Sequence, residues 1–239
     1  MNPINKLPDA IIFDCGDTLI NILNFDFSEC FNYFYEEIID QSKISKEDFL
    51  KYNKSIMHVF FERELNDIEV LFENYFNFIT FTFGNVSNKP IEVIENECSH
   101  RLYQSKPVKD VTLFLDYCKS QNIPMYVLSN SLFSTREIRK ELEENNLSHY
   151  FKEIISSGDH LYRKPSKDFF NMYLLKLKLD GITGNICYIG NSKKMDIETP
   201  IKLNMFAILL NEKLDTDFVS HDDYLEVQNY KTLIKLLKG

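Results

Sequence analysis

The chain has few of the residues that zinc-binding and disulfide-stabilised proteins require. Its 239 residues include only five cysteines, an odd number, and no two of them form a C-x-x-C pair. Zinc sites and disulfide frameworks depend on cysteines that are paired or closely spaced, so neither is indicated. Because free thiols are typical of reducing compartments, we expect a cytoplasmic protein.

A basic excess and long apolar runs are missing as well. Lys and Arg number 27 against 36 for Asp and Glu, a formal net charge of -9, whereas nucleic-acid-binding proteins normally show a basic face. No run approaches the roughly 20 apolar residues of a membrane-spanning helix, and residues 1–10 contain no apolar signal segment. We therefore expect no nucleic-acid partner and no membrane partner. A small anionic substrate is still compatible with this charge, because a pocket needs only a few local positive charges.

The composition does provide for a sizeable core, since 44% of the residues are hydrophobic and 14% are aromatic. The length allows either one large domain or a core with a modest insert. An unbroken apolar run that ends at Asp14 predicts a first strand at residues 10–14 that is buried on both faces. Apolar residues then recur at helical spacing within residues 22–104, which predicts an all-helical insert. Its helices are expected near residues 27–39, 46–63, 67–82 and 91–104.

Strand and helix patterns alternate along the rest of the chain. This alternation is typical of an α/β protein with a doubly wound parallel sheet. Residues 1–21 and 105–239 would form this α/β core around the helical insert at 22–104. Strands are expected at 124–129, 153–157, 186–190, 206–210 and 224–227, and helices at 108–121, 134–145, 166–179, 195–203 and 230–237.

Polar residues stand where three of the predicted strands end. Asp14 follows the first strand, Ser129 ends the second, and Gly190 and Asn191 end the strand at 186–190. In sheets of this kind, the site lies beyond the carboxyl ends of the strands. Taken singly, each residue has an ordinary explanation, such as a turn or a helix cap. Their order along the chain is the more informative feature.

Four stretches together resemble the ordered motifs of the haloacid dehalogenase (HAD) superfamily. They are FDCGDTL (13–19), LSN (128–130), RKP (163–165) and IGNSKKMDI (189–197). The helical insert between the first two is similar to the type 1 cap of that superfamily. The resemblance implies a Rossmann-like HAD core with a cap domain. It also implies a hydrolase, and among the HAD hydrolases most closely a magnesium-dependent phosphatase that acts on a small phosphorylated metabolite.

The resemblance implies a role for each matching residue. Asp14 would be the nucleophile that forms an aspartyl-phosphate, a carboxylate role that divides one difficult displacement into two easier ones. Lys164 would balance the charge of the phosphoryl group. The hydroxyl of Ser129 and the N–H of Asn130 would bind the phosphoryl oxygens, and Thr18 would order the loop.

The resemblance also implies a Mg²⁺ site, because a dianionic phosphate would otherwise repel the attacking carboxylate. Mg²⁺ prefers oxygen ligands, keeps several waters and needs few protein groups. The ligands would be the Asp14 carboxylate, the Gly16 carbonyl and Asp196. Asn191 would be either a weaker neutral ligand or a residue behind the ligands.

Two positions depart from the family pattern. Gly16 stands where the phosphatases usually have an aspartate that serves as general acid and base, and Asp17 comes one residue late. Asn191 replaces the first acidic residue of the fourth motif. Two alternatives therefore stay open: a catalytically weak HAD-like protein that binds a ligand or partner, and a hydrolase of carbon–phosphorus bonds that uses Lys51 or Lys54. The sequence leaves both a monomer and a homodimer open.

Overall fold

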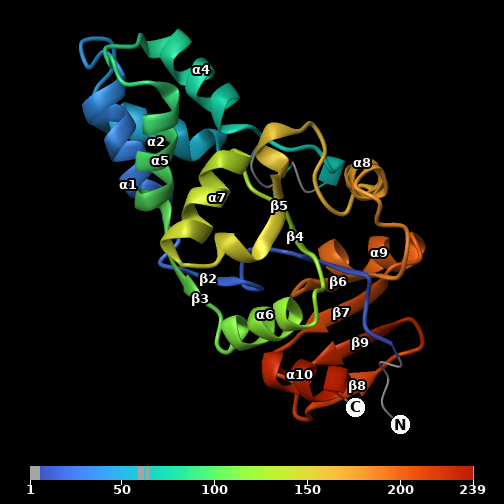
Figure 1. Ribbon diagram of the computed structural model, residues 1–239. Helices are drawn as coiled ribbons and strands as arrows, with labels where there is room; N and C mark the ends of the chain where they lie inside the picture. Colours follow the sequence, from blue (N-terminus) through green and yellow to red (C-terminus); the bar gives the residue numbers. More distant parts are fainter. Residues whose placement is uncertain (1–5, 59–61, 63–64, 239) are drawn as a thin grey trace.

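A computed structural model describes residues 6–238 except for 59–61 and 63–64 (Figure 1). Its centre is a seven-stranded sheet in the order β5-β4-β1-β6-β7-β9-β8, in which every neighbouring pair is parallel except β8 and β9. The strands are β1 (Ala10–Phe13), β4 (Met125–Ser129), β5 (Phe151–Ser156), β6 (Ile186–Gly190), β7 (Phe206–Leu210), β8 (Phe218–Ser220) and β9 (Tyr224–Val227). The predicted doubly wound α/β sheet is confirmed.

Helices cover both faces of this sheet (Figure 1). On one face lie α6 (Val111–Ser120), α7 (Thr135–Glu144) and α10 (Tyr230–Lys238), and on the other lie α8 (Lys167–Leu179) and α9 (Glu198–Lys202). Strand β1 shows why its apolar run is unbroken. Ile11 and Phe13 pack into the cluster beneath α6 and α7, whereas Ala10 and Ile12 pack into the cluster beneath α8. Alternate side chains of a strand point to opposite faces, so both faces of β1 are buried.

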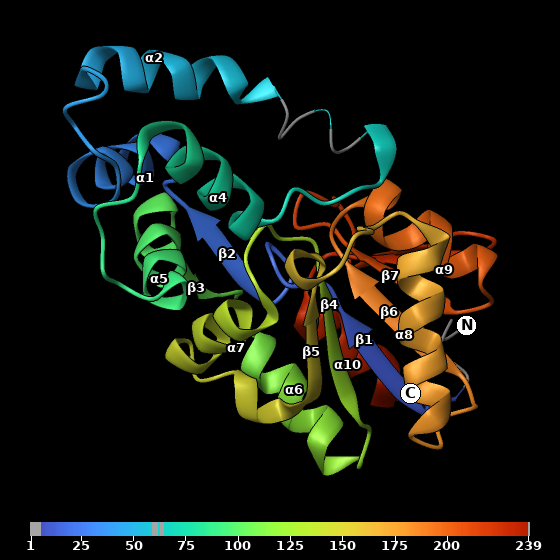
Figure 2. The same ribbon diagram turned by 90° about the horizontal axis from the view of Figure 1, so that it is seen from above.

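The helical insert gathers at one end of the molecule as a cap (Figures 1 and 2). Aromatic rings form its core: the ring of Phe34 lies 6.2 Å from Phe72, 5.2 Å from Tyr75 and 6.3 Å from Phe76. Its elements are α1 (Phe27–Tyr33), a π-helical turn (Phe34–Ile38), α2 (Lys46–Ile56), α4 (Phe72–Phe83) and α5 (Ile91–Leu102).

Helix boundaries in the cap differ from the sequence expectation, most of all within residues 46–82. The helix predicted at 46–63 ends at Ile56, and part of the remainder lies outside the described residues. The helix predicted at 67–82 begins only at Phe72. Before it, Ile68 forms a β-bridge to Tyr162 in the core, and Leu71 has an extended backbone. A long-range pairing has therefore overridden the local helical pattern.

A short antiparallel ribbon that the sequence analysis missed stands at the two ends of the insert. It consists of β2 (Ile20–Leu23) and β3 (Gln104–Pro107). Gln104 had been expected in a helix, but it pairs with Leu23, a partner distant in the sequence. The sequence of a short, partly polar strand does not by itself predict such a pairing, because the pairing depends on a distant partner. None of the helices in the described ranges is long and apolar enough to span a membrane.

Candidate active site

The three polar strand ends lie on neighbouring strands. Because β1 lies between β4 and β6 in the sheet, Asp14 is flanked by Ser129 on one side and Gly190 on the other. The N–H of Asp14 donates to the carbonyl of Ile189 at 2.9 Å, which extends the β1–β6 pairing by one residue. Parallel strands thus bring three segments that are distant in sequence to one edge of the sheet.

Lys164 reaches this edge from the loop before α8 and joins two carboxylates. Its Nζ donates to Asp14 Oδ1 at 2.6 Å and to Asp196 Oδ1 at 2.7 Å. All three side chains are buried: the exposed fractions of Asp14, Lys164 and Asp196 are 7%, 1% and 1%. The charge of a buried ammonium is compensated when two carboxylates contact it. Asp14, Lys164 and Asp196, here called the trio, together have a formal charge of -1.

The Lys164 ammonium and the two carboxylates shift one another's pKa values. Burial acts to lower the pKa of Lys164, but the Asp14 and Asp196 carboxylates outweigh it and raise that pKa well above its ordinary value. Burial raises the pKa of Asp196 to about 6, and Lys164 opposes this rise. Lys164 therefore stays a fixed positive charge at neutral pH.

Hydrogen bonds fix the position of the trio. Thr18 Oγ1 donates to Asp14 Oδ2 at 3.0 Å, so that each oxygen of the Asp14 carboxylate has a partner. The side chain of Asn130 is paired twice with the backbone of Lys164: its Nδ2 donates to the carbonyl at 2.9 Å, and its Oδ1 accepts from the N–H at 2.8 Å. Asn130 thus fastens the loop that carries the lysine to the end of β4.

Asp196 lies in a π-helical turn, Lys193–Ile197, directly after β6. Its Oδ2 accepts from the N–H of Ser192 at 3.0 Å. Gly190 makes this arrangement possible, since a Cβ at that position would lie 2.3 Å from Asp196 Cγ. Glycine is therefore required at the end of β6 for close packing rather than for an unusual backbone angle.

The remaining predicted residues lie on the segments around the trio. Ser129 is buried at the end of β4, and Gly16 is half-buried in the turn after Asp14. Asn191 is exposed, so its assignment as a ligand stays a prediction. Asp17 has a left-handed backbone (φ 54°), and its Oδ1 accepts from the N–H of Ile22 at 3.0 Å. This hydrogen bond turns the Asp17 carboxylate toward its own loop.

A cavity of about 160 Å³ opens beside these residues, between the core and the cap. Gly16, Ser129 and Asn130 line it from the core. Phe25 and Phe27 line it from the start of the cap, so two of the cap aromatics border the pocket. The described residues that line the cavity do not include Lys51 or Lys54, both of which are exposed on α2.

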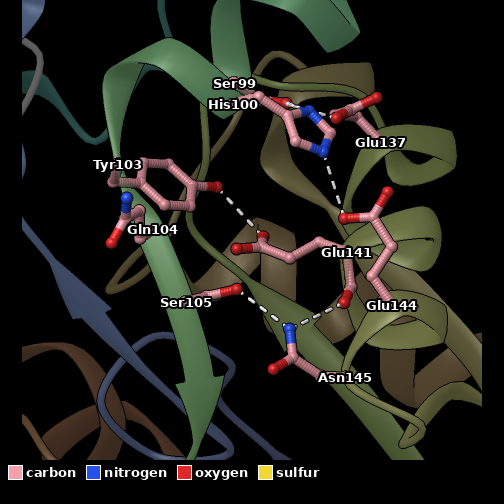
Figure 3. Close-up of a pocket in the computed structure, with 9 residues that line it drawn as sticks. All are labelled: Ser99, His100, Tyr103, Gln104, Ser105, Glu137, Glu141, Glu144 and Asn145. Carbon is pink, nitrogen blue, oxygen red and sulfur yellow. Dashed lines mark hydrogen bonds and ion pairs between the residues drawn. The ribbon is translucent and has the colours of Figure 1, made fainter.

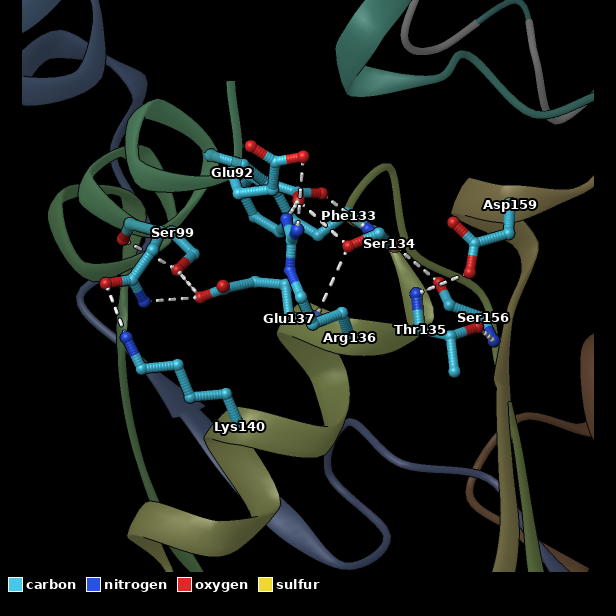
Figure 4. A network of polar contacts seen from close by, with 12 residues as sticks. Glu92, Ser99, Phe133, Ser134, Thr135, Arg136, Glu137, Lys140, Ser156 and Asp159 are labelled. Carbon is cyan, nitrogen blue, oxygen red and sulfur yellow. Dashed lines mark hydrogen bonds and ion pairs between the residues drawn. The ribbon is translucent and has the colours of Figure 1, made fainter. Parts of the chain in front are cut away.

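A polar network fastens the cap helix α5 to the core helix α7 (Figure 4). Glu95 of α5 is buried and accepts hydrogen bonds from both the N–H and the hydroxyl of Ser134, at 2.6 and 2.8 Å. Arg136 Nη2 lies 2.8 Å from Glu95 Oε2. The Glu137 carboxylate accepts from the side chain of Ser99 on α5. These contacts hold one wall of the cavity in place.

Sequence reasoning missed Tyr188 and the packing role of Gly190. The Tyr188 hydroxyl accepts from Lys164 Nζ at 2.9 Å and lies 3.3 Å from Asp196 Oδ1. The available signal was a single hydroxyl in an otherwise apolar, buried strand, since a buried phenol usually finds a polar partner. Tyr188 helps to hold the lysine between the two carboxylates.

Comparison with known proteins gives the family. Residues 11–210 match the model of the haloacid dehalogenase-like hydrolases, and the chain belongs to this family. It is 24% identical over 192 residues to YfnB of Bacillus subtilis (strain 168), which is named as a HAD-hydrolase; the match covers 79% of this chain and 78% of that protein.

Solved structures show the same fold. A HAD phosphatase from Thermococcus onnurineus matches with a TM-score of 0.61 and 19% identity, over 96% of this chain and 98% of that one. A structure of YfnB bound to magnesium matches with a TM-score of 0.58 and 18% identity, over 98% and 100%. A 2-haloacid dehalogenase from Pseudomonas syringae pv. Tomato DC3000 matches with a TM-score of 0.57 and 16% identity, over 97% and 99%.

The oxygen donors at the site suit a hard cation. The described residues contain no group of three or more His, Cys, Asp or Glu side chains that could hold a metal ion. Mg²⁺ does not need such a group, because one or two carboxylates and several waters suffice. Asp14 and Asp196 provide two buried carboxylates against one ammonium, so a further positive charge would be favourable here.

Proposed function

We propose that the protein is a magnesium-dependent phosphatase that cleaves a small phosphate ester through an aspartyl-phosphate at Asp14. The observation that supports this proposal best is the contact of Lys164 with both Asp14 and Asp196 at the carboxyl edge of the sheet. In this arrangement Asp14 provides a carboxylate nucleophile, and the buried Lys164 ammonium provides a counter-charge for a phosphoryl group.

In this proposal the Asp14 carboxylate attacks phosphorus, and Thr18 and Lys164 fix its two oxygens so that it is oriented for attack. The Ser129 hydroxyl and the Asn130 N–H bind the phosphoryl oxygens. Mg²⁺, held by Asp14, Asp196, the Gly16 carbonyl and Asn191, would supply the charge that Lys164 alone does not neutralise. The relative YfnB, whose structure is described as bound to magnesium, supports the choice of metal.

Relatives include dehalogenases as well as a phosphatase, so the reaction class depends on the site itself. The halide-cleaving branch resembles this chain less, because it normally has a tyrosine where Gly16 stands and does not depend on magnesium. The carbon–phosphorus branch needs a lysine at the pocket, and Lys51 and Lys54 are exposed on α2. A phosphate ester is therefore the substrate class that we propose.

The test is hydrolysis of p-nitrophenyl phosphate with Mg²⁺ by the unaltered protein and by Asp14→Asn. We expect turnover that is lost on chelation of the metal and is reduced to background by Asp14→Asn, because an amide is a poor nucleophile. Turnover that is equal in both proteins would refute the nucleophile assignment. Binding of phosphorylated compounds without any turnover would instead favour the catalytically weak, ligand-binding alternative.

A further inference from the structure

The site has no carboxyl group at the position where the family's phosphatases place their proton donor. Gly16 has no side chain, and a Cβ there would meet nothing closer than Ile22 Cγ1 at 3.6 Å. Asp17, the next residue, accepts a hydrogen bond from the N–H of Ile22 and lines a different cavity, with Glu212 and Tyr230. An alkoxide leaving group would therefore need its proton from elsewhere.

One carboxyl group does line the cavity beside Gly16. It belongs to Glu141, on the second turn of α7, and it is the only carboxyl group among the described residues that line this cavity. Figure 3 shows its side chain reaching from α7 toward Tyr103, whose hydroxyl donates to Glu141 Oε2 at 3.0 Å. Tyr103 lines the same cavity, so the pair forms a polar patch in a mostly apolar wall.

Glu141 also borders a second cavity of about 480 Å³, which is lined by residues of α5, β3 and α7 (Figure 3). Polar side chains line this second cavity, including His100, Glu137 and Glu144. A group with one side toward the apolar cavity and the other toward a polar one can exchange its proton with solvent between turnovers.

The surroundings of Glu141 favour its protonated form. Burial raises the pKa of Glu141; hydrogen bonds from Tyr103 and Ser105 oppose this rise, and the charges of Glu137 and Glu144 add to it. A carboxyl group with a raised pKa is a better acid catalyst near neutral pH than an ordinary one.

Glu141 also lies close to the loop that holds the nucleophile. Cys15 stands between Asp14 and Gly16 in the sequence and lines the same cavity as Glu141.

We propose that Glu141 is the proton donor to the leaving group, in place of the side chain that is missing at Gly16. This proposal rests on the proposed phosphatase function. As the Asp14 oxygen–phosphorus bond forms and the ester oxygen–phosphorus bond breaks, the Glu141 carboxyl proton passes to the departing alkoxide, which leaves as an alcohol. In the second half, the Glu141 carboxylate takes a proton from the attacking water, inorganic phosphate leaves, and Asp14 is restored.

The experiment compares two esters that differ in their need for a proton donor. A p-nitrophenolate leaves readily without a proton, whereas an alkoxide does not. Glu141→Gln keeps the size of the side chain but removes the proton. We expect it to lower kcat for an alkyl phosphate by roughly 10²–10⁴, the usual contribution of a positioned acid, and to change kcat for p-nitrophenyl phosphate by less than about tenfold.

Two further variants separate a chemical role from a structural one. Glu143→Gln on the same helix is the matched control, because Glu143 is exposed; it should alter neither rate. Gly16→Asp introduced into Glu141→Gln should restore alkyl phosphate turnover, since there is room for a side chain at Gly16. An equal loss of both esters in Glu141→Gln would overturn the donor role and leave the phosphatase function intact. No turnover of either ester by the unaltered protein would overturn both proposals.

Discussion

Replacement of Lys164 by methionine would remove the ammonium group that contacts both Asp14 and Asp196. The side chain is 1% exposed, and its Nζ lies 2.6 and 2.7 Å from the two carboxylate oxygens. At an effective dielectric constant of about 20, unit charges at this separation attract by roughly 6 kcal/mol per pair. The desolvation of the charges offsets most of this attraction. Breaking a buried ion pair from one side usually costs about 3–5 kcal/mol, which is the loss of unfolding free energy that we expect.

The assay is urea unfolding followed by far-ultraviolet circular dichroism, at neutral pH and with divalent cations chelated. For a typical denaturant slope of about 1–3 kcal/mol/M, the expected loss lowers the urea midpoint by about 1 M or more. Lys167→Met is the matched control, because Lys167 is exposed at the start of α8; its effect should stay within about 0.5 kcal/mol.

A double-mutant cycle with Asp14→Asn tests whether the loss comes from this ion pair. With one carboxylate neutralised, Lys164→Met leaves less uncompensated charge. The two substitutions should therefore be non-additive by about 0.5–3 kcal/mol, as expected for groups in contact. Additive effects, or a Lys164→Met loss as small as that of Lys167→Met, would refute the assignment of a buried, ion-paired trio.

Two further predictions concern close packing and pH. Gly190→Ala should lower the unfolding free energy, measured by urea unfolding, by about 1–3 kcal/mol, because its Cβ would lie 2.3 Å from Asp196 Cγ. Gly16→Ala is the control and should lower the unfolding free energy clearly less, because the nearest atom to its Cβ would be 3.6 Å away. Equal losses in the two variants would contradict the packing argument. Burial acts to lower the pKa of His100, but a hydrogen bond with a carbonyl of its own helix and the Glu144 carboxylate raise it overall. The raised folded-state pKa means that His100 adds stability below its unfolded value of about 6.5 and that this stability is lost as pH rises through the folded value. The melting temperature of His100→Gln should therefore be below that of the unaltered protein at pH 5.5 and equal to it at pH 9. The difference at pH 5.5 should correspond to less than about 1 kcal/mol of unfolding free energy. The same difference at both pH values would refute the role of His100 protonation.

Much of the core architecture was accessible from local patterns. Strands such as β6 and β7 were predicted with their observed bounds, because five consecutive apolar residues between polar turns have few other stable placements. The cap was harder to predict. The β2–β3 ribbon and the late start of α4 both depend on pairing with residues far away in the sequence. Local propensity contains no information about such partners.

The candidate site divides in the same way. By itself, the sequence determined which residues stand at the strand ends, since Asp14, Ser129 and Gly190 each follow or end an apolar run. Only the tertiary structure decided what those residues meet. The order of the strands makes β4, β1 and β6 neighbours, and the loop before α8 places Lys164 Nζ within hydrogen-bond distance of two carboxylates.

The proton donor is the clearest example of this division. The sequence showed that Gly16 lacks a side chain and that Asp17 is one position late. The left-handed turn and the hydrogen bond to Ile22 then direct Asp17 into its own loop. Glu141 has no distinguishing mark in the sequence, because it is one of several glutamates on a polar helix. Its position against the cavity results from the packing of α7 beside β3 and the cap, and only the folded chain could decide it.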